Sequence, residues 1–327
     1  MANYKDIHGI NIETVTSNPD TPANGQVWYN STDQKLRANA QTTAGAWSTG
    51  GSVNAARQLP FGAGSQTAGL MAGGNPGSTA TNELYNGTSW TEVANLNTGR
   101  HAGAASGITN TAVLAFGGYS TAYVSIAEEW NGSSWTEVGD MNTARTTFGG
   151  AGTNTSALGF AGNASGSATD ITESWNGSSW TEVGDLNLAR WEVYGQGSSN
   201  TAALCTGGQS PGGTYANNEN WNGSSWTEVA DVNTAKTKGA AAGQSNTSVL
   251  VFGGNPSPSQ SAKTEEWNGT GWTEIADLST GRRELGGAGI VTAALAFSGE
   301  APPNTTATEE FTGETTTARA VKTIDFD

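Results

Sequence analysis

The sequence predicts an all-β protein in which one unit of four short strands is repeated six times. A nine-residue block, Trp-Asn-Gly-Ser-Ser-Trp-Thr-Glu-Val, stands unchanged at residues 130–138, 175–183 and 221–229. The second Trp of this block returns every 43 to 46 residues between positions 47 and 272. Gly accounts for 46 of the 327 residues, a share that is typical of β proteins with many turns.

The repeated block predicts a β-hairpin. Its two aromatic residues are five positions apart and enclose Asn-Gly, which supplies the positive φ angles that short hairpin turns need. Looser copies occupy residues 85–93 and 267–275. An isolated hairpin is only marginally stable, so we expect a chain that repeats one to stack the copies against each other.

The rest of each unit follows a fixed order. Ten residues after the second aromatic comes a cation, then a run of small residues and an apolar strand that usually ends in Gly-Gly. A variable loop leads to the first aromatic of the next block, which has Glu two residues before it. The first aromatics are Tyr85, Trp130, Trp175, Trp221, Trp267 and Phe311; the second are Trp47, Trp90, Trp135, Trp180, Trp226 and Trp272; the cations are Arg57, Arg100, Arg145, Arg190, Lys236 and Arg282.

Four strands in about 45 residues are typical of one blade of a β-propeller. Strands that crowd around a central channel favour Gly and Ala, whereas blades widen outward, so the Trp side chains belong in the outer strands. We therefore predict a six-bladed propeller over residues 45–315, with structural roles for the repeated Trp and Arg.

The two ends of the chain do not fit the repeat. In residues 1–44, Ile10, Ile12 and Val15 predict a short strand, and residues 26–37 predict a small hairpin. This leader forms either an attachment module or a cap. The sixth unit has Phe311, but Thr316 stands where its second Trp is expected. We expect residues near Trp47 to complete that blade; the alternative is the tail at 316–327, with Val321, Ile324 and Phe326.

These residues resemble the kelch repeat. Arg100, Gly117-Gly118, Trp130 and Trp135 occupy the positions of the leading Arg, the double Gly, the aromatic and the later Trp of that family. The resemblance covers roughly residues 45 to 315 and implies a propeller. Individual units depart from it, with Ala161-Gly162 and Ser298-Gly299 at the double-Gly position and Lys236 in place of Arg.

Composition excludes several classes of function. A net charge of −15 repels phosphate, so we expect neither nucleic acid nor an anionic membrane as a partner. No run of 18 apolar residues suits membrane insertion. His8, His101 and Cys205 are too few for a typical transition-metal site such as that of the kelch-type copper oxidase. We expect no cofactor, no metal and no enzymatic activity.

The repeated carboxylates predict structure rather than catalysis. A catalytic pair is needed once per protein, whereas these residues recur once per unit. We expect Glu129 and its equivalents to bond to the backbone or to the repeated Arg.

Ligand binding is expected where the repeat is broken. Trp191 follows Arg190 at a position that varies between units, and Tyr194 is close to it in sequence. A stacking platform for a sugar or peptide is one interpretation; a local packing substitution is the favoured one. Tyr119, Tyr123 and Tyr215 lie in variable loops and are further candidates.

The chain also resembles kelch-like virion proteins of marine tailed phages. The element Gly25-Gln26-Val27-Trp28-Tyr29-Asn30-Ser31, followed by near-identical blades, carries this resemblance. It implies a virion protein made in the host cytoplasm: a tail fibre, a receptor-binding protein or a capsid decoration. Its partners would be other virion proteins, through the leader or the tail, and a host glycan or protein receptor; homo-oligomerisation is left open. The alternatives are a bacterial surface or secreted adhesin that binds glycans and a glycan-active enzyme.

Overall fold

The computed structural model describes residues 12–19, 26–256 and 259–323, without the side chains of residues 38–44 and 314–323. Over these residues the protein is all-β and contains no helix. The described part of the chain therefore has no helix that is long and apolar enough to cross a membrane. The chain divides into two compact units. The smaller comprises Met1–Gly45 with Gly313–Asp327, and the larger comprises Ala46–Thr312.

The larger unit is built from antiparallel sheets. Among the described residues, five sheets have four strands each. In chain order their strands are β4 (Phe61–Ser65), β5 (Ala68–Ala72), β6 (Asn82–Tyr85) and β7 (Trp90–Val93); β8 (Ala104–Thr109), β9 (Ala112–Phe116), β10 (Ala127–Trp130) and β11 (Trp135–Glu137); β12 (Gly149–Thr153), β13 (Ser156–Phe160), β16 (Thr172–Trp175) and β17 (Trp180–Glu182); β18 (Tyr194–Ser199), β19 (Ala202–Thr206), β22 (Asn218–Trp221) and β23 (Trp226–Val229); β24 (Ala240–Ser245), β25 (Ser248–Phe252), β26 (Thr264–Trp267) and β27 (Trp272–Ile275).

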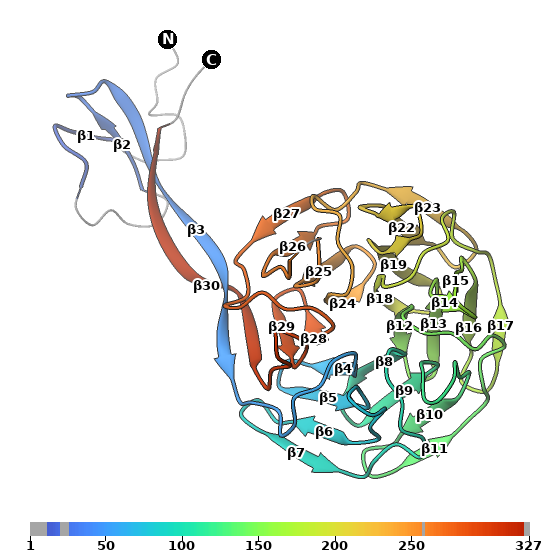
Figure 1. Ribbon diagram of the computed structural model, residues 1–327. Coiled ribbons are helices and arrows are strands. Elements are labelled where there is room, and N and C mark those ends of the chain that lie inside the picture. Colours follow the sequence, from blue (N-terminus) through green and yellow to red (C-terminus); the bar gives the residue numbers. More distant parts are fainter. Residues whose placement is uncertain (1–11, 20–25, 257–258, 324–327) are drawn as a thin grey trace. The chain divides into compact units, whose positions relative to one another are not determined.

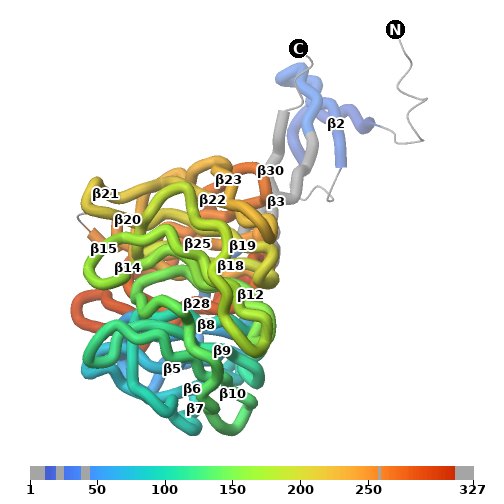
Figure 2. The backbone as a smooth tube through the Cα atoms, turned by 90° about the vertical axis from the view of Figure 1, so that its right-hand side faces the viewer, coloured from blue at the N-terminus to red at the C-terminus, as the bar shows by residue number. Residues whose placement is uncertain are grey.

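A sixth sheet uses strands from both ends of the chain. Its order is β1-β2-β3-β30-β29-β28. The strands that it adds are β28 (Gly286–Ile290), β29 (Ala293–Phe297), β30 (Thr308–Thr323), β3 (Lys35–Gly50), β1 (Glu13–Val15) and β2 (Val27–Asn30). Two short hairpins lie in the loops. One pairs β14 (Asn163–Ala164) with β15 (Ser167–Ala168), and the other pairs β20 (Gln209–Ser210) with β21 (Gly213–Thr214). Figure 2 shows both hairpins projecting from the same face of the larger unit.

One edge strand of each sheet lies innermost in the larger unit (Figure 1). Each of β4, β8, β12, β18, β24 and β28 packs beside the next, and β28 packs beside β4. These strands approach closely: a Cβ atom on Gly62 of β4 would lie 2.7 Å from the carbonyl oxygen of Gly287 in β28. Side chains would not fit there, which explains the Gly- and Ala-rich strands.

The repeated Trp side chains pack between neighbouring sheets. The ring of Trp180 lies 4.8 Å from that of Phe116 in the preceding sheet, and Trp226 lies 4.9 Å from Phe160. Trp90 of the first sheet contacts Phe297 of the sixth at 5.0 Å. The repeated Trp side chains therefore lie in outer strands, as predicted, and fill the space between neighbouring sheets.

The hairpin of the repeated block forms where the sequence predicts it. Trp130 is paired with Trp135, and Gly132 adopts a φ of 93°. The side chain of Asn131 accepts hydrogen bonds from the amides of Ser133 and Ser134 at 2.9 and 3.0 Å. Gly thus supplies the positive φ, and Asn stabilises the turn through its side chain.

Trp47 completes the sixth sheet of the larger unit. Its ring lies 5.3 Å from Phe311 and 5.0 Å from Phe252. Its Nε1 donates to Thr264 Oγ1 at 3.0 Å, as Nε1 of Trp90 does to Thr308 Oγ1 at the same distance. Of the two alternatives for this fourth strand, the region of Trp47 is the one observed. Ile324 and Phe326 lie outside the described residues.

The smaller unit has a core of its own. Strand β1 pairs in parallel with β2, and β2 pairs antiparallel with β3, so the hairpin predicted around residues 26–37 is present. Trp28 is fully buried, and its Nε1 donates to Asn18 Oδ1 at 3.1 Å. Asn30 donates to the same oxygen at 3.2 Å. Ile10, Gly25 and the first eleven residues in general lie outside the described part of the chain.

Candidate functional site

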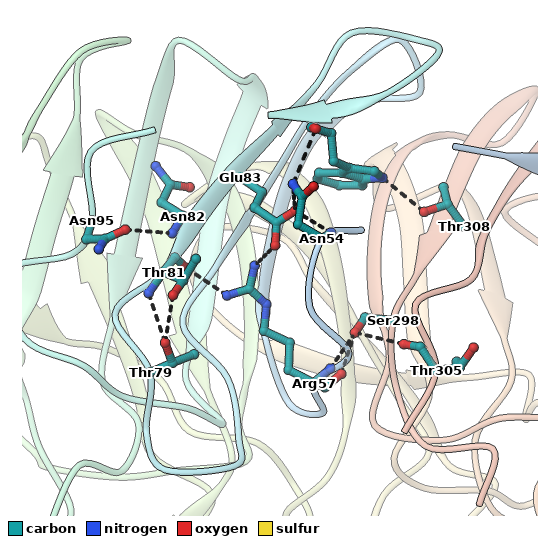
Figure 3. Close-up of polar contacts among 11 residues, drawn as sticks. Asn54, Arg57, Thr79, Thr81, Asn82, Glu83, Asn95, Ser298, Thr305 and Thr308 are labelled. Carbon is teal, nitrogen blue, oxygen red and sulfur yellow. Dashed lines mark hydrogen bonds and ion pairs between the residues drawn. The ribbon is translucent and has the colours of Figure 1, made fainter. Parts of the chain in front are cut away.

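A buried ion pair anchors one loop of each sheet in the larger unit. Figure 3 shows the first, between Arg57 and Glu83, where Arg57 also donates to the carbonyl of Thr81 at 3.0 Å. Glu83 accepts in addition from the amide of Asn54 at 2.8 Å. The equivalent pairs, all at most 4% exposed, are Arg100–Glu128, Arg145–Glu173, Arg190–Glu219, Lys236–Glu265 and Arg282–Glu309.

These pairs confirm the structural role expected for the repeated carboxylates. The residue that fulfils it is Glu128, two positions before Trp130, whereas Glu129 accepts a hydrogen bond from Asn154 Nδ2 at 2.6 Å. A fully buried carboxylate is stable only when it is paired and hydrogen-bonded. Each pair therefore fixes the backbone immediately after the cation.

The residue two positions after each cation forms part of what we call the mouth ring. All of its members have a left-handed backbone, with φ between 54° and 60°. Most successive members are hydrogen-bonded through their backbones: the amide of Ala102 donates to Leu59 O at 2.9 Å, that of Thr147 to Ala102 O at 2.6 Å, that of Glu192 to Thr147 O at 2.6 Å and that of Glu284 to Lys238 O at 2.5 Å. The mouth ring consists of Leu59, Ala102, Thr147, Glu192, Lys238 and Glu284.

The absence of Gly from the mouth ring is informative. A left-handed conformation costs an L-residue roughly 1–2 kcal/mol, and Gly avoids that cost. The chain uses Gly at many other positions of positive φ, including Gly73, Gly117 and Gly207. Left-handed residues with side chains concentrate at functional sites, where the surrounding structure compensates for the strain. The mouth ring presents different side chains on the same backbone, as a recognition site does.

A second set of residues, the collar, lies one position closer to each cation. Each collar residue forms a β-bridge with the residue that follows the double Gly or its substitute. Trp191 is bridged to Gln209, and Thr146 to Asn163, at the bases of the two short hairpins. The collar consists of Gln58, His101, Thr146, Trp191, Thr237 and Arg283. Its side chains vary as much as those of the mouth ring, so this face carries the individual chemistry of each repeat.

Three charged residues of the mouth ring form one cluster. Lys238 Nζ lies 2.9 Å from Glu284 Oε1 and 3.4 Å from Glu192 Oε1. Burial raises the pKa of the Glu192 carboxyl, as does the nearby Glu284, while Lys238 opposes the shift. Burial lowers the pKa of Lys238, but its two carboxylate partners outweigh that effect and raise it. Gln209 Nε2 also donates to Glu192 Oε2, at 2.8 Å.

The mouth ring encloses a cavity of about 110 Å³. Its wall takes two consecutive residues from every sheet of the larger unit: the mouth-ring residue and the next one. The latter are Pro60, Gly103, Phe148, Val193, Gly239 and Leu285. The same residues line a second cavity of about 130 Å³ deeper in the centre, where Gly and Ala predominate. Of the two cavities, the one at the mouth ring is therefore the one lined by charged side chains.

Two of the predicted ligand residues, Trp191 and Tyr194, do not lie together at the surface. Trp191 is half-buried in the collar. Tyr194 is only 3% exposed, and its hydroxyl donates to the carbonyl of Thr237 at 3.2 Å. Its ring fills the space over Gly239, where a Cβ atom would lie 2.3 Å from Tyr194 Cε1. Tyr194 is therefore a core residue rather than part of a stacking platform.

The remaining predicted tyrosines lie in the loops next to the collar. Tyr119 is bridged to His101, with the two rings 5.6 Å apart, and Tyr123 packs edge-on against Tyr119 at 5.7 Å. The hydroxyl of Tyr215 is hydrogen-bonded to Ser210 Oγ at 2.7 Å, in the hairpin loop of the fourth sheet. All three are partly exposed.

Sequence reasoning did not single out the charged half of the mouth ring. The available signal was that position two after the cation is never Gly in a chain with 46 Gly residues. In the described part of the chain, no group of three or more His, Cys, Asp or Glu residues is arranged to hold a metal ion. Comparison of the sequence with protein-family models and with curated proteins found no match to either.

Proposed function

We propose that the larger unit is a six-bladed kelch-like β-propeller and that the protein is a non-enzymatic structural protein of a tailed-phage virion. The smaller unit would attach it to the particle, and the mouth ring with the collar would bind a receptor on the host surface. The observation that carries this proposal is the mouth ring itself, where one backbone conformation, repeated six times, places five different kinds of side chain around a cavity.

The propeller interpretation rests on sheet packing. Strand β28 packs beside β4, and Trp90 contacts Phe297, so the last sheet adjoins the first. Trp47 occupies the fourth-strand position of the sixth sheet. In the sixth sheet of the larger unit, the N-terminal region thereby supplies one strand and the C-terminal region three. Pairing of strands from the two ends of the chain in one sheet is an arrangement that favours a closed ring of sheets.

The smaller unit contains both ends of the chain, which supports a role in attachment. Residues 1–45 and 313–327 cluster together, apart from the larger unit. The buried Trp28 and its bond to Asn18 belong to the Trp-Tyr-Asn element that resembles phage leaders. No mouth-ring residue lies in the smaller unit, so attachment and receptor binding would use different residues.

The proposal is tested on purified phage particles. Mass spectrometry of particles from a density gradient should detect the protein at a fixed ratio to the major capsid protein, and cryo-electron microscopy should locate it. Detection only in infected-cell lysate would contradict the virion assignment. Detection on the surface of uninfected bacteria would favour the adhesin instead.

Receptor binding by the mouth face is tested separately with purified protein on host cells. Trp191→Ala in the collar and Tyr119→Ala in the loop next to it should weaken adsorption if this face contacts the receptor, whereas Glu182→Gln on the outer strand β17 should not. Unchanged adsorption of both aromatic variants would rule out a role for these side chains and leave Trp191 as a packing residue.

A further inference from the structure

The charges at the mouth ring are unbalanced. Glu192 and Glu284 share a single ammonium group, that of Lys238, at 3.4 and 2.9 Å. The nearest collar charges do not correct this, because Arg283 is paired with Glu300 at 2.9 Å. Burial lowers the pKa of His101, which favours the neutral form of its ring, although Glu284 opposes this shift. The cluster therefore carries one uncompensated negative charge beside a cavity.

The other side of the cavity is uncharged. The mouth-ring residues of the first three sheets are Leu59, Ala102 and Thr147, opposite a charged half on the last three. Pro60 and Phe148, which directly follow Leu59 and Thr147, add apolar groups to the lining on this side. The volume of about 110 Å³ has room for several water-sized groups. These dimensions suit a short alkyl chain better than a complete sugar ring.

We propose that the mouth cavity binds a primary ammonium group carried on a short apolar stem, as on a lysine side chain of a receptor. The ammonium lies against the two carboxylates, and the methylene groups lie against the uncharged half. Lysine stems commonly bury their methylene groups while the charged end keeps polar partners. The inference rests on the proposed function, since it names the chemistry of the receptor group.

An anionic ligand would meet unfavourable electrostatics. Lys238 is the one cation among the residues that line the cavity, and its ammonium group already contacts two carboxylates. Bringing a third carboxylate to Lys238 leaves two negative charges in excess. Bringing an ammonium group neutralises the cluster, and like charges at such distances repel strongly where water is partly excluded.

The experiment measures binding of small probes to the purified full-length protein by calorimetry and by ligand-observed NMR. The probes are n-butylammonium, 1-butanol, butyrate, and Nα-acetyl-lysine methylamide with and without an acetyl group on Nε. We expect butylammonium and the free lysine derivative to bind at least about tenfold more tightly than their uncharged counterparts. Equal binding of butanol and butylammonium, or no saturable binding of either amine, would overturn the proposal.

Variants locate the site. Glu192→Gln and Glu284→Gln each remove the surplus charge and should weaken butylammonium binding about tenfold. Lys238→Met leaves two unpaired carboxylates and should tighten it. Glu182→Gln, on an exposed outer strand, is the matched control and should change nothing. Melting temperatures of all four variants verify folding; if the folded Gln variants bind butylammonium as the wild type does, the cavity is not the site.

The result is independent of where the protein resides. Amine binding that depends on Glu192 and Glu284, in a protein absent from particles, would support this inference and refute the virion assignment. If particles carrying Glu192→Gln adsorb normally and the purified wild-type protein binds no amine, only this inference is refuted.

Discussion

The amide of Leu59 donates a 2.7 Å hydrogen bond to the carbonyl of Glu284, which joins the first and last members of the mouth ring. Both residues follow a buried cation by two positions and both are left-handed. Such a bond cannot be formed locally, because its partners lie at opposite ends of the larger unit in sequence. It depends on all the intervening sheets being in place, and it positions Leu59 beside Glu284, at the edge of the charged half.

Replacement of Lys236 by Arg should stabilise the protein. In the other units a guanidinium group reaches both a carboxylate and backbone carbonyls, as Arg145 does with Ile171 O at 2.7 Å and Gly159 O at 2.9 Å. Lys236 Nζ lies 3.2 Å from Glu265 but makes no hydrogen bond within the described structure, and burial lowers its pKa. Hydrogen bonds to charged groups contribute about 1.5–3 kcal/mol, so we expect a rise in unfolding free energy of roughly that size.

Urea denaturation monitored by Trp fluorescence measures this change. Lys236→Met is the informative counterpart, since it leaves the buried Glu265 without its cation and should cost about 3–5 kcal/mol. A Lys236→Arg variant less stable than the wild type would show that the fifth sheet has adapted its packing to lysine.

Replacement of Trp47 should destabilise the larger unit as much as loss of a core aromatic. Its ring packs against Phe252 and Phe311 and its Nε1 is hydrogen-bonded to Thr264. Truncation of a fully buried Trp to Ala costs about 3–5 kcal/mol, and because Trp47 is only partly buried we expect the lower end of that range. Trp191→Ala, also half-buried but in the collar, is the control and should cost less. Equal midpoints of thermal unfolding for the two variants would argue against Trp47 as the fourth-strand residue.

Replacement of two adjacent threonines by Gly should have opposite effects. Thr147 is left-handed with a φ of 54°, which is unfavourable for a β-branched residue. Thr147→Gly should therefore stabilise by roughly 0.5–1 kcal/mol. Thr146 is buried, without a positive φ, and its Oγ1 donates to Ala102 O at 3.0 Å, so Thr146→Gly should destabilise. Differential scanning calorimetry distinguishes the two; destabilisation by both would mean that the mouth-ring backbone is not strained.

Amine binding should decline on acidification. The folded-state pKa of Glu192 is raised above its ordinary value of 4.5, chiefly by burial. As the pH falls, Glu192 therefore takes up a proton before an ordinary Glu does, and the cluster with Lys238 and Glu284 becomes neutral. The midpoint of the loss in butylammonium affinity should lie above pH 4.5, and Glu192→Gln should remove this transition.

The loss of affinity should not be a consequence of unfolding. Because the pKa of Glu192 is higher in the folded than in the unfolded state, the folded state takes up this proton more readily, so this group adds stability as pH falls. Circular dichroism across the same pH range provides the check. A midpoint below pH 4.5, or one that coincides with unfolding, would contradict the assignment.

Much of the local architecture was predictable because it depends on neighbours in the sequence. The Asn131–Gly132 turn, the apolar second strands and the period of the repeated Trp all follow from short-range patterns. The carboxylate of each ion pair was also predictable in type, since a charge that recurs in every unit needs a recurring partner. Tyr194 was not: its burial depends on Gly239 in the next sheet, which lacks the Cβ atom that its ring would meet.

The sequence by itself determined the number of repeats, the strands of each and the residues that wedge the sheets apart, because periodicity records burial directly. Only the tertiary structure decided which ends complete the sixth sheet and what gathers at the mouth ring. Glu192, Lys238 and Glu284 lie some 46 residues apart in sequence, and each follows a buried, ion-paired cation by two positions. These three side chains are in contact because neighbouring sheets bring the same position of successive repeats close together. Charges that lie in three separate repeats therefore form one cluster.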